Sequence, residues 1–256
     1  FGRTNPTHPH SWLFVDQPFA IGRVFGAEGN RGLGVEGSVL LPLPWFVEVV
    51  ASSNGIGGEA TNRSWLDAAD DGIGSPADLH STTAIKQFFP LSDDWSLAWG
   101  LSYAGAPNGT GRGNRAEVFG TDVYLRWRPI TEGSYAYVTL ESEWLYRRRQ
   151  IPSDVLADWT SYTQLGWRFA RRWGAGARWE YGTPAKDLEG VVGADPLDPE
   201  WTRDRHRTSV DVSFWPSHFS RLRVQTAADA LGADPVDLSA FVQFEVLTGA
   251  HGAHTF

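Results

Sequence analysis

The segment Val236-Asp237-Leu238-Ser239-Ala240-Phe241-Val242-Gln243-Phe244-Glu245-Val246 alternates apolar and polar side chains, with Phe241 as its exception. Successive side chains of an extended strand point to opposite faces, so one face of this segment is continuously apolar. The segment extends over ~36 Å at ~3.3 Å per residue, which is about twice the usual length of a soluble strand. A strand tilted at about 45° across the ~25 Å apolar band of an outer membrane needs this length. The segment therefore predicts a membrane-spanning β-strand.

The same period of two recurs along most of the chain. It is regular in residues 96–103, 119–127, 136–147, 162–169, 173–181, 205–214 and 221–225. It is weaker in residues 35–41, 47–53 and 79–89, and weakest in residues 14–25, which would form the first strand. Almost no segment has the apolar spacing of a helix, so the chain is expected to be all-β.

The expected connections between strands alternate between short and long. Short turns fall at residues 42–44, 92–94, 131–134, 171–172 and 217–218. Long loops fall at residues 54–78, 105–114, 148–158, 183–202 and 230–235, and they are rich in Gly, Pro, Asp and Asn. Short periplasmic turns and longer extracellular loops are typical of outer-membrane barrels.

These patterns predict a closed up-and-down antiparallel transmembrane β-barrel of about 12 strands, the even number that closes a bacterial barrel. Residues 1–256 form a single domain, with an N-terminal segment at 1–13 and a His-containing C-terminal tail at 248–256. Aromatic residues near the short turns would mark the membrane interface; filling of a sandwich core is the alternative. The four tryptophans expected at the periplasmic interface are Trp127, Trp167, Trp173 and Trp215.

Composition removes several classes of protein. The 256 residues carry a net charge of −8, with 41% apolar residues and no cysteine. The chain has no apolar run near 20 residues, which excludes a helical membrane protein, and the absence of Cys excludes disulfide scaffolds and cysteine nucleophiles. The net charge argues against nucleic-acid binding. The first residues have neither a basic nor an apolar region of a secretory signal, so we expect any such signal to have been removed.

Residues 14–256 resemble a Gram-negative outer-membrane β-barrel porin. The likeness rests on the alternating strands, the aromatic bands and the terminal Phe256. The runs Asn5-Pro6-Thr7-His8-Pro9-His10, Phe14-Val15-Asp16-Gln17-Pro18 and Leu41-Pro42-Leu43-Pro44-Trp45, together with Gly34, resemble uncharacterised proteobacterial outer-membrane proteins that are distantly similar to phosphate-selective porins.

This resemblance implies a solute channel in the bacterial outer membrane. Its expected partners are membrane lipid and lipopolysaccharide, small hydrophilic solutes and the outer-membrane assembly machinery, with a homo-oligomer or larger membrane complex left open. One departure is that the alternation ends near Leu247, before the tail, rather than at the terminal aromatic residue.

If the apolar faces contact lipid, the polar faces line the lumen. The lumenal candidates for solute selectivity are Arg168, Arg178, Arg205, Arg207, Arg221, Arg223, Glu141 and Glu143. An arginine wall opposite carboxylates would bias a narrow pore toward anions. The alternative is a set of compensating ion pairs between neighbouring strands that fixes register and fills the barrel.

The resulting hypothesis is a channel for passive diffusion of small hydrophilic solutes, with an anion bias. The alternative is a plugged, non-conducting barrel that serves as a scaffold for partner proteins. An enzyme is not expected, because His80 and Ser81 are adjacent on a strand and point to opposite faces. The other candidate is His206 with Asp204 and Asp211, and the alternation places His206 on the lipid-side face of its strand.

No catalytic residue and no resident cofactor are expected. Two weaker alternatives involve divalent cations. His251 and His254 could bind Zn²⁺ together with His8 and His10, although unliganded tails are the simpler explanation. The acidic loops 54–78 and 183–202 could bind Ca²⁺ or bridge to lipid phosphates, although solvated loops are more common.

Overall fold

The computed structural model describes residues 1–56, 61–65, 75–131, 135–190, 195–232 and 234–247. These residues form one antiparallel sheet of twelve strands, of which β9 has only two residues. The strands are β1 (Gly34–Leu40), β2 (Phe46–Asn54), β3 (His80–Pro90), β4 (Trp95–Pro107), β5 (Arg115–Trp127), β6 (Tyr137–Ile151), β7 (Asp154–Arg168), β8 (Trp173–Gly182), β9 (Lys186–Asp187), β10 (Arg205–Ser217), β11 (Ser220–Leu231) and β12 (Asp237–Val246). The helical elements are α1 (Phe19–Phe25) and three short turns, η1 (Pro9–Ser11), η2 (Arg63–Trp65) and η3 (Pro76–Asp78).

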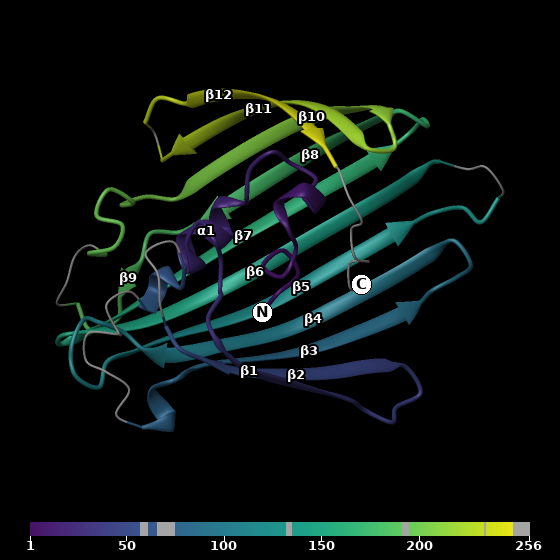
Figure 1. The fold of residues 1–256 in the computed structure, drawn as a ribbon. Coiled ribbons are helices and arrows are strands. Elements are labelled where there is room, and N and C mark those ends of the chain that lie inside the picture. Colours follow the sequence, from purple (N-terminus) through teal and green to yellow (C-terminus); the bar gives the residue numbers. More distant parts are fainter. Residues whose placement is uncertain (57–60, 66–74, 132–134, 191–194, 233, 248–256) are drawn as a thin grey trace.

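Each long strand pairs with the next one along the chain, β8 pairs with β10, and β9 lies beside β7. The prediction of an all-β, up-and-down antiparallel sheet is therefore confirmed. Among the described residues no ladder joins β1 to β12, so the sheet is open between these two edges (Figure 1). We call the end with the β1–β2, β3–β4, β5–β6, β7–β8 and β10–β11 connections the short-turn end, and the opposite end the long-loop end.

The curled sheet exposes its apolar face and buries its polar face, which is the reverse of the arrangement in a soluble protein. On the convex face Val212 pairs with Val224, which pairs with Val242, and these side chains are 48%, 47% and 76% exposed. On the concave face Arg178 and Arg223 are almost completely buried. Period-two alternation thus separates an exposed apolar face from a buried polar face.

Residues 14–25 were expected to form a strand, and this prediction is wrong: they contain α1. Pro18 occupies the N-cap position, where a residue without an N–H costs no hydrogen bond. Ile21 and Phe25 are spaced i, i+4 and share one helical face. Gly26 ends the helix with φ of 90°, a conformation that favours glycine. No helix in the described part of the chain is long and apolar enough to cross a membrane.

The long loop expected at residues 148–158 is also absent. β6 continues to Ile151 and β7 begins at Asp154, and these two residues pair across a tight turn in which Ser153 has φ of 66°. The polar sequence stays in the strand because Arg147 and Arg149 point to the concave face, where buried carboxylates bind them. A run of charged residues therefore predicted a loop where it forms the lining of the sheet.

Of the four tryptophans near the short turns, two are exposed on the convex face, Trp127 is half-buried, and Trp215 lies on the other face. Trp167 and Trp173 are 52% and 45% exposed on the convex face. Trp215 instead packs against Gly174 and beneath the guanidinium of Arg168 on the concave face. Trp215 continues the positions of Asp211 and Ser213, which are buried on the concave face, so the period of two itself directs it there.

Candidate functional site

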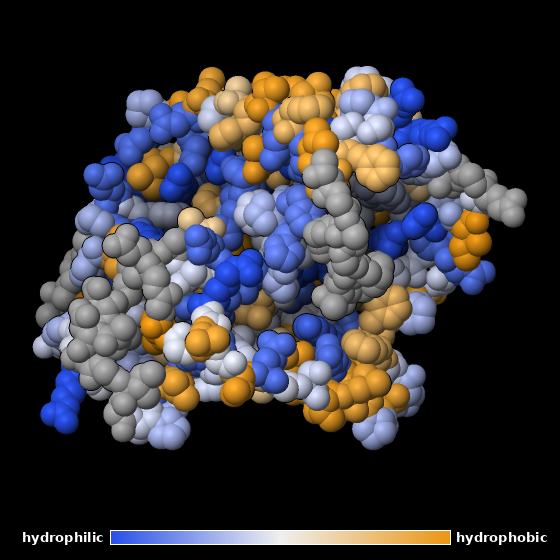
Figure 2. All heavy atoms as spheres, viewed as in Figure 1, coloured by the Kyte–Doolittle hydropathy of each residue, from blue (hydrophilic) through white to orange (hydrophobic). Residues whose placement is uncertain are grey.

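The concave face of the sheet is occupied by residues 1–32, which we call the inner segment. In Figure 1 this purple segment, including α1, lies over the middle of the sheet and continues down to β1. The same view in space-filling form shows hydrophilic residues across the middle of the molecule and hydrophobic residues along the margin over β10–β12 (Figure 2). The inner segment is held at four places along its length.

The first place is Asp16, whose carboxylate lies among residues from three strands. Arg178 Nη2 donates to Asp16 Oδ1 at 2.7 Å, and Gln225 Nε2 donates to the same oxygen at 2.7 Å. Arg207 Nη2 donates to Asp16 Oδ2. Burial alone would raise the pKa of Asp16, but the Arg178 charge, the Gln225 hydrogen bond and the Arg207 charge together lower it. Asp16 is therefore held as a carboxylate that ties the inner segment to β8, β10 and β11.

The second place is the backbone around η1. Arg221 Nη2 donates to the carbonyl oxygen of His10 at 2.8 Å, and Arg223 Nη2 donates to that of Trp12 at 3.0 Å. Arg221 also pairs with Glu245 on β12 at 2.8 Å. Planar guanidinium groups can bind several acceptors in fixed directions, so these two arginines fix the backbone of the inner segment.

The third place is Thr4, near the start of the chain. Its hydroxyl contacts the hydroxyl of Tyr162, which donates to Glu141 at 2.7 Å and to Glu143 at 2.9 Å. Thr4 Oγ1 also donates to Glu141 at 3.0 Å. Arg3 lies 3.6 Å from the centroid of the Tyr124 ring, in a cation–π geometry. Acidic residues of β6 thus hold the first turn of the inner segment.

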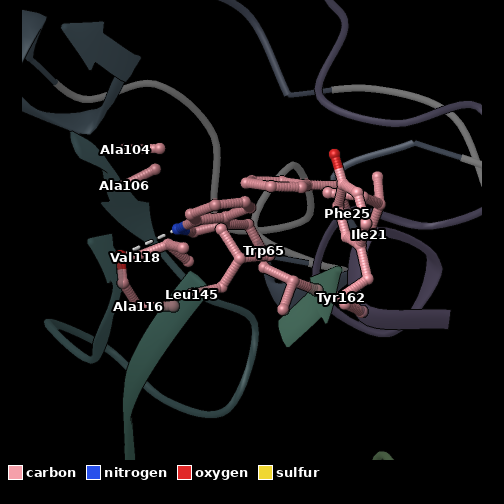
Figure 3. Packing of buried hydrophobic residues seen from close by; sticks show 11 residues of the cluster. Ile21, Phe25, Trp65, Ala104, Ala106, Ala116, Val118, Leu145 and Tyr162 are labelled. Atoms are coloured by element: carbon pink, nitrogen blue, oxygen red, sulfur yellow. Dashed lines mark hydrogen bonds between the residues drawn. The ribbon is translucent and has the colours of Figure 1, made fainter. Parts of the chain in front are cut away.

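The fourth place is an apolar cluster around α1. Ile21, Val24 and Phe25 are fully buried and pack against the indole of Trp65, which follows β2 (Figure 3). The Trp65 indole N–H donates to the Ala116 carbonyl at 2.8 Å. Small side chains on β4 and β5, including Ala104 and Ala116, leave room for this ring. Burial of each large side chain contributes about 1.5–3 kcal/mol, so α1 is firmly packed.

An ion-pair network covers α1 at the long-loop end. Its members are Arg23, Arg63, Arg147, Arg149, Asp158, Asp195 and Asp198. Arg147 Nη2 lies 2.6 Å from Asp158 and 3.1 Å from Asp195, and these three side chains are at most 2% exposed. Burial would raise the pKa of Asp198, but the hydrogen bond from Arg63 and the charges of Arg63, Arg23 and Arg147 lower it. The network joins the inner segment to two loops.

The predicted lumenal residues all lie on the concave side, but they occupy different places along the strands and have different binding partners. Arg178, Arg207, Arg221 and Arg223 come together around the inner segment, as described above. Arg205 pairs with Asp229 at 2.6 Å, toward the long-loop end. Arg168 lies at the short-turn end and donates to the Arg171 carbonyl at 2.6 Å. Glu141 and Glu143 bind Thr4 and Tyr162 rather than facing an arginine wall across an open pore.

Sequence reasoning missed the partners supplied by the inner segment. Asp16 is a single carboxylate between Val15 and Gln17, and no spacing rule connects it to arginines 162 and 191 residues later. The available signal was electrostatic: a face with so many buried arginines needs carboxylates that its own strands do not all supply. Tyr162 and Gln225 lay on the predicted polar face without an assigned role.

The proposed metal ligands receive no support from the described residues. His251 and His254 lie outside them. His8 and His10 stack with ring centroids 5.6 Å apart. Across the described ranges, no group of three or more His, Cys, Asp or Glu side chains is arranged to hold a metal ion. In the acidic loop 183–202, Asp195 and Asp198 are bound by arginines; Asp67, Asp70 and Asp71 of the other loop lie outside the described residues.

His80 and Ser81 lie on opposite faces of the sheet, and so do His206 and Asp211. His80 is fully buried against Trp65 with ring centroids 4.5 Å apart, whereas Ser81 is exposed. His206 is exposed and contacts the Trp179 and Tyr181 rings, whereas Asp211 is 3% exposed on the other face.

Comparison with known proteins gives one relative of unassigned activity. The chain is 28% identical, over its whole length, to an uncharacterised protein of Aquifex aeolicus (strain VF5). It spans 58% of the length of that relative. No protein-family model and no solved structure matches the chain.

Proposed function

We propose that the chain is an outer-membrane β-barrel whose lumen is closed by its own inner segment. The observation that carries this proposal is the inner segment itself, which fills the concave face and is bound there by Asp16, Thr4 and α1. Its contacts satisfy buried arginines and carboxylates that would otherwise face an aqueous pore. The proposal therefore favours a plugged barrel with a structural role over a permanently open channel.

The membrane location is supported by the exposed apolar convex face and by the length of the strands. β6 and β7 each have 15 residues, more than the 9–11 that a tilted strand needs to cross a bilayer. A bilayer leaves no unpaired strand edge, so the proposal includes closure of the wall between β1 and β12. The short-turn end would face the periplasm, and lipid and lipopolysaccharide would surround the convex face.

A second candidate is the passive channel for small hydrophilic solutes. It is favoured by one observation, a cavity of about 600 Å³ at the short-turn end that is lined by arginines. Conduction through this route requires the inner segment to leave the concave face. A barrel of about 12 strands also encloses a narrower space than the 16–18 strands of an open porin.

Planar-bilayer recording separates these two candidates. The parent chain is expected to insert and to remain closed for most of the recording. The double variant Asp16→Asn with Glu180→Gln weakens the binding of the inner segment, because Glu180 accepts a hydrogen bond from the Phe19 N–H at 2.9 Å. The length of the inner segment is unchanged in this variant. This variant is expected to show frequent opening events. A chain lacking residues 2–32 should conduct continuously.

A matched control is Asp234→Asn, which changes an acidic residue that is 57% exposed and 3.8 Å from Arg203. It should behave as the parent does. Steady conductance of the parent at the level of the truncated chain would contradict closure by the inner segment. Failure of the folded parent to associate with lipid vesicles would contradict the barrel itself.

A further inference from the structure

The cavity at the short-turn end has an unusual lining. It is formed by the ends of β5, β6 and β7, the β7–β8 turn and the β10–β11 turn. Five arginines line it, which we call the pocket arginines: Arg126, Arg128, Arg168, Arg171 and Arg172. Among the residues that the structure describes, the lining contains no carboxylate and none of the five arginines forms an ion pair.

The pocket opens on the concave side of the sheet. Tyr124, two residues before Arg126, contacts Arg3 of the inner segment. Gly166, two residues before Arg168, lies against Leu13 of the same segment. Residues two apart in a strand share a face, so Arg126 and Arg168 point to the inner side, beyond the end of the inner segment. They therefore lie on the face opposite to the exposed apolar residues.

The curvature of the sheet brings distant strands to this one cavity. β5 and β11 are separated by five inter-strand steps in the sheet order, or about 24 Å along the sheet at ~4.8 Å per step. Residues from β5 and from the β10–β11 turn nevertheless line the same space. A ligand there would be contacted from several sides, which is the condition for specific binding.

Two of the pocket arginines, Arg168 and Arg171, are held in place by aromatic rings without being neutralised. Arg168 lies 4.3 Å from the centroid of the Trp215 ring and donates one hydrogen bond, to the Arg171 carbonyl. Its Nε is buried and has no hydrogen-bond partner in the described structure. Arg171 lies 5.6 Å from the Tyr135 ring centroid. Several N–H donors therefore remain available to an acceptor that enters the pocket.

We propose that this pocket binds a small organic anion with two or more acidic groups on a planar or apolar body. The acidic groups would accept paired hydrogen bonds from the guanidinium forks. The body would contact Tyr135, Tyr137 and Trp215, which a bare inorganic anion would leave unused. This inference goes beyond the plugged barrel and does not depend on it, because it rests only on the short-turn end of the concave face.

The test measures the binding of isophthalate to the full chain by titration calorimetry, in detergent micelles at low ionic strength. Inorganic phosphate and benzoate are titrated in parallel. Isophthalate should bind more tightly than either. The double variant Arg126→Gln with Arg168→Gln should bind isophthalate at least about tenfold more weakly, as expected when a charge-assisted hydrogen bond is lost.

Two further variants keep the result interpretable. Arg171→Gln with Arg172→Gln changes two exposed turn residues, and it should also weaken binding. Arg203→Gln removes an arginine that is 58% exposed at the long-loop end and should leave binding unchanged. Equal affinity of the parent and both double variants would overturn the proposal, as would absence of isophthalate binding to the folded parent. Phosphate binding as tight as that of isophthalate would refute the role of the aromatic wall.

Discussion

Replacement of Asp16 by Asn should loosen the inner segment more than any other single substitution on it. Asp16 accepts hydrogen bonds from Arg178, Arg207 and Gln225. Removing one partner of a buried ion pair usually costs about 3–5 kcal/mol. The Asp16 side chain is 21% exposed, and both arginines keep Glu180 at 3.3 and 3.8 Å. We therefore expect a cost of about 2–3 kcal/mol, discounted for exposure and for the remaining pair.

This cost translates into a change in how often the inner segment leaves the sheet. At about 1.4 kcal/mol per tenfold, the open population should rise about 30- to 140-fold. Ser209→Cys supplies a reporter, because Ser209 is 1% exposed on the concave face and its hydroxyl has no hydrogen-bond partner in the described structure. The parent chain contains no cysteine, so a water-soluble maleimide reacts only at this position.

The labelling rate of Ser209→Cys should follow the open population when closing is faster than labelling. Adding Asp16→Asn should therefore raise the rate by the factor given above, and adding Asp234→Asn should not change it. The folded state of each variant is checked by circular dichroism. An unchanged labelling rate in a folded Asp16→Asn variant would refute the view that this carboxylate holds the inner segment.

Three further outcomes are expected. Acid should release the inner segment, because the pKa values of Asp16 and Asp198 are lower in the folded state than in the unfolded chain. Their contribution to stability is complete above the ordinary carboxyl pKa of about 3.9 and is lost as the pH falls through the folded pKa values. An acid titration followed by near-ultraviolet circular dichroism measures this loss. Brominated lipid should quench the fluorescence of Trp167 and not that of Trp215. Trp167→Phe should therefore remove a quenched component, whereas Trp215→Phe should not. Tyr162→Phe should destabilise the chain to denaturant by about 1–3 kcal/mol, because it removes a buried donor to two carboxylates.

The strands were predictable because membrane-type alternation is a local signal. Residues 236–246 predicted β12, and the alternation at 119–127 predicted most of β5. The polar faces were also assigned to the concave side correctly, since residues two apart share a face. What the alternation did not decide was where polar strands end, because Arg147 and Arg149 looked like loop residues until their buried carboxylate partners were known.

The inner segment could not be derived from periodicity. Its residues 1–32 contain one short helix and many irregular turns, so they follow neither a period of two nor a sustained period of 3.6. Their positions are fixed by contacts with strands that follow 100 or more residues later, such as Gly2 with Ser102 and Val15 with Gln225. Such contacts are determined by tertiary structure and leave no local pattern.

The strong preference for arginine over lysine follows from the polar interior. Only Lys86 and Lys186 are lysines among the 22 cationic residues, and both are exposed. Arg178, which is 2% exposed, bonds the Asp16 carboxylate and carbonyl and lies 3.3 Å from Glu180. The flexible ammonium group of lysine cannot form such paired contacts in fixed directions. A chain that buries its charges and exposes its apolar residues needs this geometry to bind a segment inside, and in the described part of the chain the pocket arginines offer the same geometry without an ion pair.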